Sequence, residues 1–209
     1  MYRNEPLETY LKDAASGKPT PGGGSVAALV GALATTMSSM SANFTIGKEK
    51  FKQYEPQLKK ILEECEKSRE TLLSLMEEDI KVYSKVSSAY ALPKSTEAEK
   101  KLRSETIQKA TIIAMEVPLK ATMCCLYVLE LTRELVDIAN PNLISDVGVA
   151  GFLADAAFQC AKLNVAINLA CIKNQSLIEK VQSEISHAEK KAKSFFHEIK
   201  EAVQAKIQG

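Results

Sequence analysis

Residues 54–91 read YEPQLKKILEECEKSRETLLSLMEEDIKVYSKVSSAYA, and this stretch decides the fold class. Its apolar residues recur every three or four positions, and lysine and glutamate occupy many of the positions between them. The stripe consists of Leu58, Ile61, Leu62, Cys65, Leu72, Leu75, Met76, Val82 and Val86. This spacing places the apolar side chains on one face of a helix, where they can pack on a core. The stretch therefore predicts one long amphipathic helix.

Helical periodicity also covers most of the chain on either side of this stretch. Tryptophan is absent and aromatic residues make up only 6% of the sequence, so little material remains for a sheet. Further helices are expected at residues 7–15, 25–44, 95–139, 145–172 and 176–207. Because long helices joined by short loops pack antiparallel, the sequence predicts an all-α, up-and-down bundle of five to six helices, several of them long. We expect them to form a single domain over residues 1–209.

Prolines and capping residues set the expected helix ends. Residues 92–94 (LPK) end the long helix, and a capping box of Ser95 or Thr96 with Ala98 or Glu99 starts the next one. Helix formation is therefore expected to resume directly after this short loop.

Three further expectations concern the middle of the chain. Pro118 removes a backbone hydrogen bond within its helix, so a kink or a break is expected there. Residues 140–142 (NPN) stop that helix, and Ser145 with Asp146 is expected to cap the next one. The helix at 25–44 is rich in alanine, serine and glycine, which allows close approach of its neighbours. It should be the central and most buried helix.

The overall composition argues against several classes of partner. The chain has 27 basic and 26 acidic residues and a formal charge of +1, so no long-range field favours nucleic acid or an anionic membrane. No segment is expected to reach the roughly 18 uncharged apolar residues of a membrane span. The N-terminus carries no apolar stretch typical of a signal peptide, so a cytoplasmic location is expected.

Cysteine and histidine give no sign of a metal site. The five cysteines are odd in number and lack paired metal-ligand spacing, so they are interpreted as reduced core thiols. His187 and His197 lie in a charged terminal helix and are expected to face solvent. The sequence therefore predicts no metal centre.

The turn at residues 21–25 (PGGGS) is a candidate binding element. Gly22, Gly23 and Gly24 let the backbone approach a ligand closely, and the free N–H groups at the start of the following helix, which include that of Ser25, favour an anion or a carbonyl oxygen. A phosphate loop needs a preceding strand and a following Lys-Ser/Thr, and both are missing. The turn is thus interpreted either as one wall of a ligand site or as a flexible turn needed for packing.

Asp79 is the candidate acid-base residue. Adjacent helical residues lie about 100° apart, so the acids Glu77, Glu78 and Asp79 cannot share one face. The apolar stripe places Asp79 on the inward side, where a carboxylate is costly unless it is paired or used. The alternative is a carboxylate buried against a lysine or an arginine for packing.

Four other polar residues are candidates for binding. Lys94 and Arg103 are cations around a helix start, where acids are usually favoured, although surface charge is an alternative explanation. Asn164 and Asn168 lie four residues apart on one face of an otherwise apolar helix. These amides need hydrogen-bonding partners, which either a ligand such as a pteridine ring or a neighbouring helix can supply.

These elements occur in a fixed order along nearly the whole chain. They are residues 21–28 (PGGGSVAA), Asp79, residues 92–94 (LPK) with Thr96, residues 99–100 and Arg103, residues 117–119 (VPL), residues 145–147 (SDV), and residues 164–165 with 167–169. As a series they resemble the formiminotransferase-cyclodeaminase family. The likeness is to its cyclodeaminase domain, which also occurs as a free-standing chain and is related to methenyltetrahydrofolate cyclohydrolases.

The resemblance implies a helical protein that dimerises and acts on a reduced folate, including one with a polyglutamate tail, and that uses no other cofactor. The family reaction closes 5-formimidoyltetrahydrofolate to 5,10-methenyltetrahydrofolate with release of ammonia. It requires a proton taken from N10 and one delivered to the leaving nitrogen, and Asp79 matches the acidic position. The binding residues are then expected to be Gly22, Gly23, Gly24 and Ser25 against the folate, Lys94 and Arg103 for the tail or developing charge, and Ser145, Asp146, Asn164 and Asn168 for the pterin edges.

Two alternatives stay open from the sequence. A free-standing member can instead hydrolyse the methenyl bridge to 10-formyltetrahydrofolate, because both reactions pass through attack on the same carbon. A non-enzymatic helical interaction module has a similar amphipathic pattern. Tight binding of reduced folate distinguishes the enzymes from the module.

Overall fold

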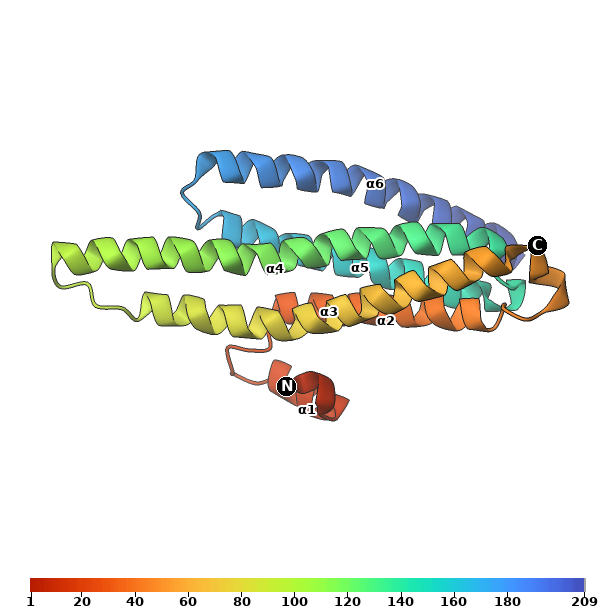
Figure 1. Ribbon diagram of the computed structural model, residues 1–209, viewed down its shortest axis with the longest axis horizontal. Coiled ribbons are helices and arrows are strands. Elements are labelled where there is room, and N and C mark those ends of the chain that lie inside the picture. The colour runs from red at the N-terminus through yellow and green to blue at the C-terminus, as the bar shows by residue number, and fades with distance from the viewer. Residues whose placement is uncertain (209) are drawn as a thin grey trace.

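The computed structural model describes residues 1–208, which form six α-helices and no strand (Figure 1). Short 3-10 helices η1 (Tyr2–Asn4), η2 (Glu49–Tyr54) and η3 (Pro141–Leu143) precede α1, α3 and α5. The predicted all-α bundle is confirmed, and each helix begins and ends within a few residues of its expected position. The α-helices are α1 (Leu7–Ala14), α2 (Gly23–Asn43), α3 (Glu55–Tyr90), α4 (Glu97–Ile138), α5 (Ile144–Leu169) and α6 (Gln175–Gln208).

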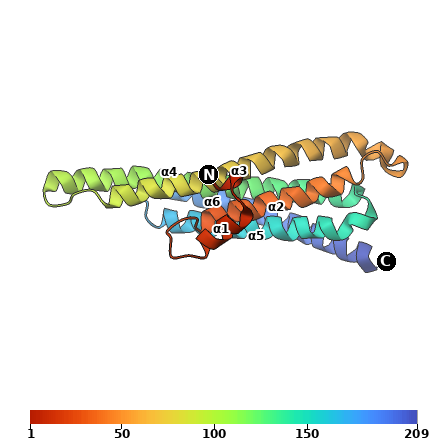
Figure 2. The same ribbon diagram turned by 90° about the horizontal axis from the view of Figure 1, so that it is seen from below.

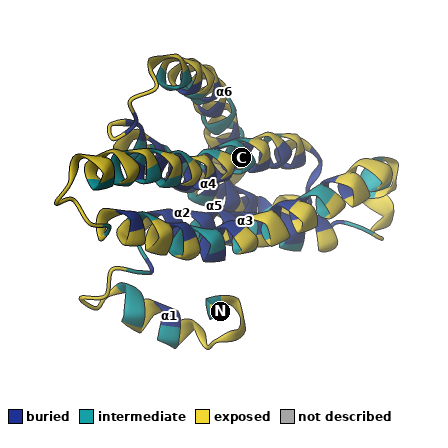
Figure 3. Ribbon diagram, turned by 60° about the vertical axis from the view of Figure 1, so that its left-hand side comes forward, coloured by how far each residue is buried: buried dark blue, intermediate teal, exposed yellow. Residues whose placement is uncertain are grey.

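The long helices α2 to α6 pack side by side, and each runs antiparallel to the one before it (Figures 1 and 2). Helix α2 contacts α3 and α5, and α4 contacts α3, α5 and α6. The α3–α4 hairpin extends beyond the ends of the other helices, whereas α1 lies outside the bundle (Figure 1). Figure 3 shows buried residues on the faces that the helices turn toward one another.

Helix α2 is the most buried helix, with 12 of its 21 residues buried. Gly31 shows why small residues are needed, because a Cβ there would lie 2.9 Å from Cys125 Sγ and 3.2 Å from the Leu72 methyl groups. The buried Ser38 hydroxyl is paired, since its Oγ lies 3.0 Å from Thr132 Oγ1, whereas the Ser39 hydroxyl has no partner among the described residues. The central position is shared, however, because α4 contacts α6 in addition to α2, α3 and α5.

Helix α4 confirms the predicted capping box and is not broken at Pro118. Thr96 accepts a hydrogen bond from the Glu99 N–H, and Glu99 accepts one from the Thr96 N–H. The helix continues through Pro118, so the break allowed by the sequence does not occur. Pro118 is buried in the bundle, and Thr122 Oγ1 donates to its carbonyl at 2.8 Å. Packing on both sides of the proline therefore outweighs the lost backbone hydrogen bond.

The expected cap of α5 is wrong. Helix α5 begins at Ile144 with Leu143 at the N-cap position and no side-chain cap, so Ser145 and Asp146 already lie in its first turn. The capping residue lies further upstream, where Asn140 Oδ1 accepts the Asn142 N–H at 3.2 Å and opens η3. Because η3 leads directly into α5, the helix needs no second cap.

Two composition-based expectations are also corrected. By length and composition, α2, α4 and α5 are each long and apolar enough to cross a bilayer. In the bundle these three helices contact one another. Among the cysteines, Cys65 and Cys125 are buried as expected, whereas Cys160 and Cys171 are exposed. His187 and His197 are exposed, which confirms their predicted position.

Candidate active site

The glycine turn and Asp79 meet at the start of α2. Gly22 occupies the N-cap position and has no side chain with which to cap the helix. Asp79 of α3 supplies the missing acceptor, because its Oδ2 accepts the Ser25 backbone N–H at 3.0 Å. Ser25 is the third residue of α2, which is a usual position for the N–H that a capping side chain binds. Asp79 therefore caps α2 from a neighbouring helix.

Gly24 makes this approach possible. A Cβ at Gly24 would lie 2.8 Å from Asp79 Cγ and closer still to Oδ1. Gly23 is also close to another helix, since a Cβ there would lie 3.4 Å from both polar side-chain atoms of Asn164. These glycines therefore lie against specific polar side chains, and this close packing agrees with both interpretations of the turn.

The surroundings of Asp79 make its charge costly. Burial raises the pKa of the Asp79 carboxyl above its ordinary value, and the hydrogen bond from the Ser25 N–H partly opposes that rise. Within residues 1–208 no lysine or arginine forms an ion pair with this carboxylate. The predicted inward position is confirmed, and the alternative of an acid paired with a cation is excluded for these residues.

A pocket of about 330 Å³ opens beside Asp79 between four helices. It brings together six of the residues expected from sequence: Gly22, Gly23, Gly24, Asp79, Asn164 and Asn168. The other lining residues are Pro19, Val82, Tyr83, Val86, Ala114 and Ile167. A mainly apolar wall with a few convergent polar groups is typical of a small-molecule site.

Asn164 and Asn168 supply the amides of this pocket. Both are half-buried. Asn164 Nδ2 donates to the Cys160 carbonyl at 2.9 Å, and Asn168 Nδ2 donates to the Asn164 carbonyl at 2.8 Å. Each side chain is thereby held along its own helix. The amide oxygens form no hydrogen bond with residues 1–208 and can accept from a ligand.

Three further candidates do not line the pocket. Ser25 is fully buried, and its hydroxyl lies 3.0 Å from the Tyr10 hydroxyl. Arg103 donates to the Tyr90 carbonyl and lies over the Tyr90 ring, so it ties α4 to the end of α3. Lys94 is exposed in the loop between these helices. The structure thus places both cations at the tip of the hairpin.

Ser145 and Asp146 are not brought to this pocket within one chain. They lie in the first turn of α5, whereas Asn164 lies several helical turns further along, toward the other end of the same helix. Ser145 is exposed and Asp146 is half-buried.

Sequence reasoning missed several lining residues. Tyr83 follows Asp79 by four positions and is half-exposed at the pocket, so helical spacing was a usable signal. Ile167 could not be recognised as a lining residue, because an exposed apolar side chain does not indicate a binding role from sequence. Tyr10 does not line the pocket, and its contact with Ser25 depends on how the N-terminal segment folds back.

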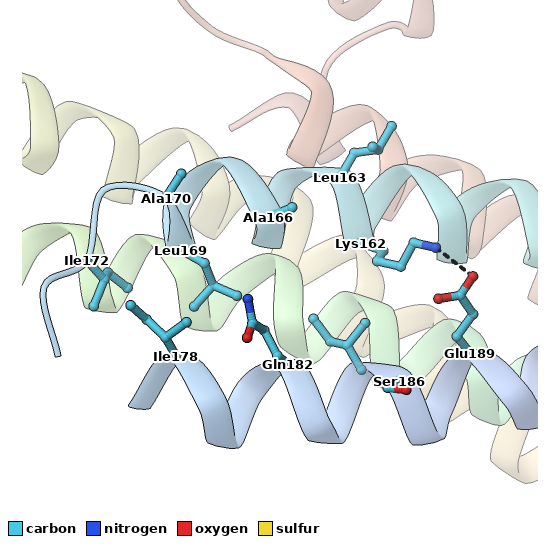
Figure 4. Close-up of a pocket in the computed structure, with 11 residues that line it drawn as sticks. Lys162, Leu163, Ala166, Leu169, Ala170, Ile172, Ile178, Gln182, Ser186 and Glu189 are labelled. Carbon is cyan, nitrogen blue, oxygen red and sulfur yellow. Dashed lines mark ion pairs between the residues drawn. The ribbon is translucent and has the colours of Figure 1, made fainter. Parts of the chain in front are cut away.

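A larger cavity of about 550 Å³ lies between α5 and α6 (Figure 4). Leu169, Ile172 and Ile178 contribute to its apolar wall. Its charged residues, Lys162 and Glu189, pair with each other at 3.0 Å. The smaller pocket is the better candidate for proton transfer, because its carboxylate is unpaired within the described chain.

Comparison with known proteins identifies the family. The model of the formiminotransferase-cyclodeaminase family matches residues 6–187. A methenyltetrahydrofolate cyclohydrolase from Methylorubrum extorquens is 38% identical, and the match covers 99% of this chain and 100% of the relative. A formimidoyltransferase-cyclodeaminase from Rattus norvegicus is 28% identical over 90% of this chain, but the chain spans only 35% of that protein.

A solved structure shows the same fold. The crystal structure of a formiminotetrahydrofolate cyclodeaminase from Thermotoga maritima matches with a TM-score of 0.90 and 30% sequence identity. The match covers 98% of each chain. These relatives include two kinds of folate enzyme, a cyclohydrolase and cyclodeaminases. The chain belongs to the formiminotransferase-cyclodeaminase family, whose members act in folate one-carbon metabolism.

Proposed function

We propose that the Asp79 pocket binds a reduced folate and that Asp79 transfers protons to and from the nitrogen and oxygen atoms that react at its one-carbon unit. The observation that carries this proposal is one unpaired carboxylate that lines a pocket together with two side-chain amides. Its raised pKa lies closer to neutral pH than that of an exposed aspartate, which suits a group that takes up and releases a proton.

The first candidate reaction is hydrolysis of 5,10-methenyltetrahydrofolate to 10-formyltetrahydrofolate. Asp79 takes a proton from water as the water oxygen attacks the methenyl carbon. The bond from this carbon to N5 then breaks, and N5 receives the proton from Asp79. The hydroxyl of the intermediate releases its proton to solvent as the formyl group forms. The 38% identity to a cyclohydrolase over its whole length supports this candidate.

The second candidate is the cyclodeaminase reaction, which the sequence analysis placed first. Here N10 attacks the carbon of the protonated formimidoyl group (N5–CH=NH2⁺), and Asp79 takes the N10 proton. Asp79 then delivers that proton to the amino group, which leaves as ammonia while 5,10-methenyltetrahydrofolate forms. The full-length likeness to the Thermotoga maritima cyclodeaminase supports this candidate. In both reactions the carboxylate is regenerated and no cofactor other than the folate is used.

The pocket walls can bind the pterin end of such a substrate. Gly22, Gly23 and Gly24 offer backbone without side chains, against which a flat pterin can lie. Asn164 and Asn168 offer amide oxygens to the N–H groups of the pterin edge. The pterin and the one-carbon unit are therefore assigned to the enclosed part of the pocket.

The tail is assigned to the α3–α4 hairpin. Arg103 lies near the start of α4 and precedes the lining residue Ala114 by several helical turns, so its Cα is well removed from the pocket. Lys94 lies in the adjoining loop, at the same tip. These cations are thus placed to attract the carboxylates of a glutamate or polyglutamate tail rather than to contact the reacting carbon.

We also propose that a second copy of the chain covers the outer face of α2 and α5. Helix α2 contains no charged residue over its 21 positions, although part of its surface is exposed. Such an uncharged apolar face is typical of an obligate interface between identical chains. The exposed apolar residues of this face are Val26, Leu33, Phe44, Val149, Phe152, Leu163 and Ile167.

The two reactions are separated by supplying methenyl and formimidoyl substrates to the purified protein in parallel. Loss of the methenyl absorbance above the uncatalysed rate identifies the cyclohydrolase, and release of ammonia from the formimidoyl substrate identifies the cyclodeaminase. If neither rate rises and no reduced folate binds tightly, the enzymatic proposal fails and the helical interaction module is favoured. A cytoplasmic location stays a prediction for cell fractionation.

A further inference from the structure

The N-terminal segment is attached to the active-site helices by specific hydrogen bonds. Tyr10 is the one buried residue among the eight residues of α1. Its hydroxyl lies 3.0 Å from Ser25 Oγ. Two residues before Asp79 in α3, buried Glu77 accepts the Arg3 backbone N–H at 2.9 Å. A segment that lies outside the bundle (Figure 1) thus reaches both helices that form the Asp79 contact.

The Tyr10 hydroxyl is linked to Asp79 through one residue. Ser25 binds Tyr10 through its side chain and donates its backbone N–H to Asp79 at 3.0 Å. Ser25 is fully buried, so its hydroxyl faces Tyr10 instead of the pocket. The Tyr10 contact therefore restrains the residue whose N–H stabilises the charged form of the carboxylate.

We propose that Tyr10 is a positioning residue of the active site, which fixes Ser25 so that the first turn of α2 holds the Asp79 carboxylate in its reactive orientation. The expected effect on turnover rests on the proposed function, because it requires that Asp79 transfers protons in the reaction. The hydrogen-bonded chain itself rests on the structure alone.

The other groups around Asp79 do not replace this contact. Helix α2 offers its backbone, α4 offers Ala114, and α5 offers the amides of Asn164 and Asn168. The titratable groups nearby are Tyr83 on α3 and, on the far side, Tyr10 and Glu77. Burial raises the pKa of the Tyr10 hydroxyl, and the negative charges of Asp79 and Glu77 raise it further. Tyr10 therefore stays protonated near neutral pH and keeps its hydrogen bond to Ser25.

Tyr2 provides a matched control within the same segment. Its ring packs edge-to-face on Tyr10 with centroids 5.3 Å apart. Its hydroxyl donates to Asp13 at 2.7 Å and forms no hydrogen bond with Ser25 or Asp79. Tyr2→Phe and Tyr10→Phe each remove one hydroxyl and leave an aromatic ring in place. They should therefore perturb packing similarly and differ in their connection to Asp79.

The first test is an NMR titration of the aspartate carboxyls, with the Asp79 signal assigned by its loss in Asp79→Asn. Tyr10→Phe should raise the pKa of Asp79, because a less restrained Ser25 N–H stabilises the carboxylate less. Tyr2→Phe should leave the Asp79 pKa unchanged and instead raise that of Asp13, which loses one hydrogen bond. This titration requires no turnover, so its outcome is independent of the proposed reaction.

The second test is kinetic and uses Ser25→Ala, which removes the hydroxyl but keeps the N–H. Tyr10→Phe and Ser25→Ala should each lower kcat by about tenfold with little change in KM, and the double variant should be no slower than either single one. The acidic limb of the rate profile should move to higher pH. If Tyr10→Phe matches Tyr2→Phe in both the Asp79 titration and kcat while melting like wild type, Tyr10 only packs and the proposal is overturned.

Discussion

The carboxylate of Asp79 accepts the backbone N–H of Ser25, 54 residues earlier in the chain, at 3.0 Å. This one contact joins α3 to the first turn of α2 and explains two features of the sequence together. The glycines remove side chains that would collide with the carboxylate, and the carboxylate supplies the cap that a glycine cannot provide.

Gly24→Ala tests the close approach. The added Cβ would collide with the Asp79 carboxylate, so the side chain must rotate away from its position. We expect kcat/KM to fall about 100-fold, because small displacements of a reacting group have costs of this size. Gly17→Ala is the control, since nothing lies within 4 Å of a Cβ there. Equal activity of the two variants would contradict the placement of Asp79.

Asp79→Asn should stabilise the fold at neutral pH. Burial raises the pKa of Asp79, so the folded protein loses stability as the pH rises from the ordinary carboxyl range through that raised pKa. Asparagine removes the charge and keeps an acceptor for the Ser25 N–H. The variant should melt at a higher temperature than wild type at pH 7, and the difference should vanish below about pH 3. A lower melting temperature at pH 7 would show that the charge stabilises the fold.

Lys94→Gln tests the assignment of the tail. Lys94 is exposed at the hairpin tip, away from the lining residues of the pocket. Its removal should raise KM several-fold for a polyglutamylated substrate and leave KM for the monoglutamate unchanged, because only the longer tail adds charges for it to attract. Lys200→Gln on α6 is the control. An equal change in KM for both substrates would place Lys94 in another role.

Leu33→Glu tests the interface between copies. Leu33 is 49% exposed in the middle of the uncharged α2 helix, where a carboxylate would be buried in the proposed dimer. Light scattering after gel filtration should give the dimer mass for wild type and half that mass for the variant. Leu102→Glu alters a leucine of similar exposure on the hairpin and should remain dimeric. A monomeric wild type would rule out this interface.

The sequence predicted the fold and the Asp79 carboxylate because both depend on local periodicity. The stripe through α3 gave the helix and the inward face of Asp79, and the Thr96–Glu99 capping box marked the start of α4. The cap of α5 was misplaced because Asn140 opens a 3-10 helix before it, which the Asn-Pro pair could have indicated.

The remaining features depend on contacts between distant segments. The contact between Tyr10 and Ser25 requires α1 to fold back over α2. Helical periodicity does not predict how two helices joined by a loop pack on each other. Arg103 binds the Tyr90 carbonyl at the end of α3, a contact that its position near a helix start did not indicate. The separation of Asp146 from Asn164 follows from their positions on one helix and could have been calculated from the helical rise.

The most direct test of the account compares Asp79→Asn with Glu77→Gln on the methenyl and formimidoyl substrates. Glu77 is a buried acid two residues away whose Oε1 accepts the Arg3 N–H, and glutamine retains an acceptor there. With folding verified by circular dichroism, Asp79→Asn should slow turnover of the active substrate about 1,000-fold, whereas Glu77→Gln should stay within a few-fold of wild type. Turnover by Asp79→Asn within a few-fold of wild type would contradict the assignment of proton transfer to Asp79.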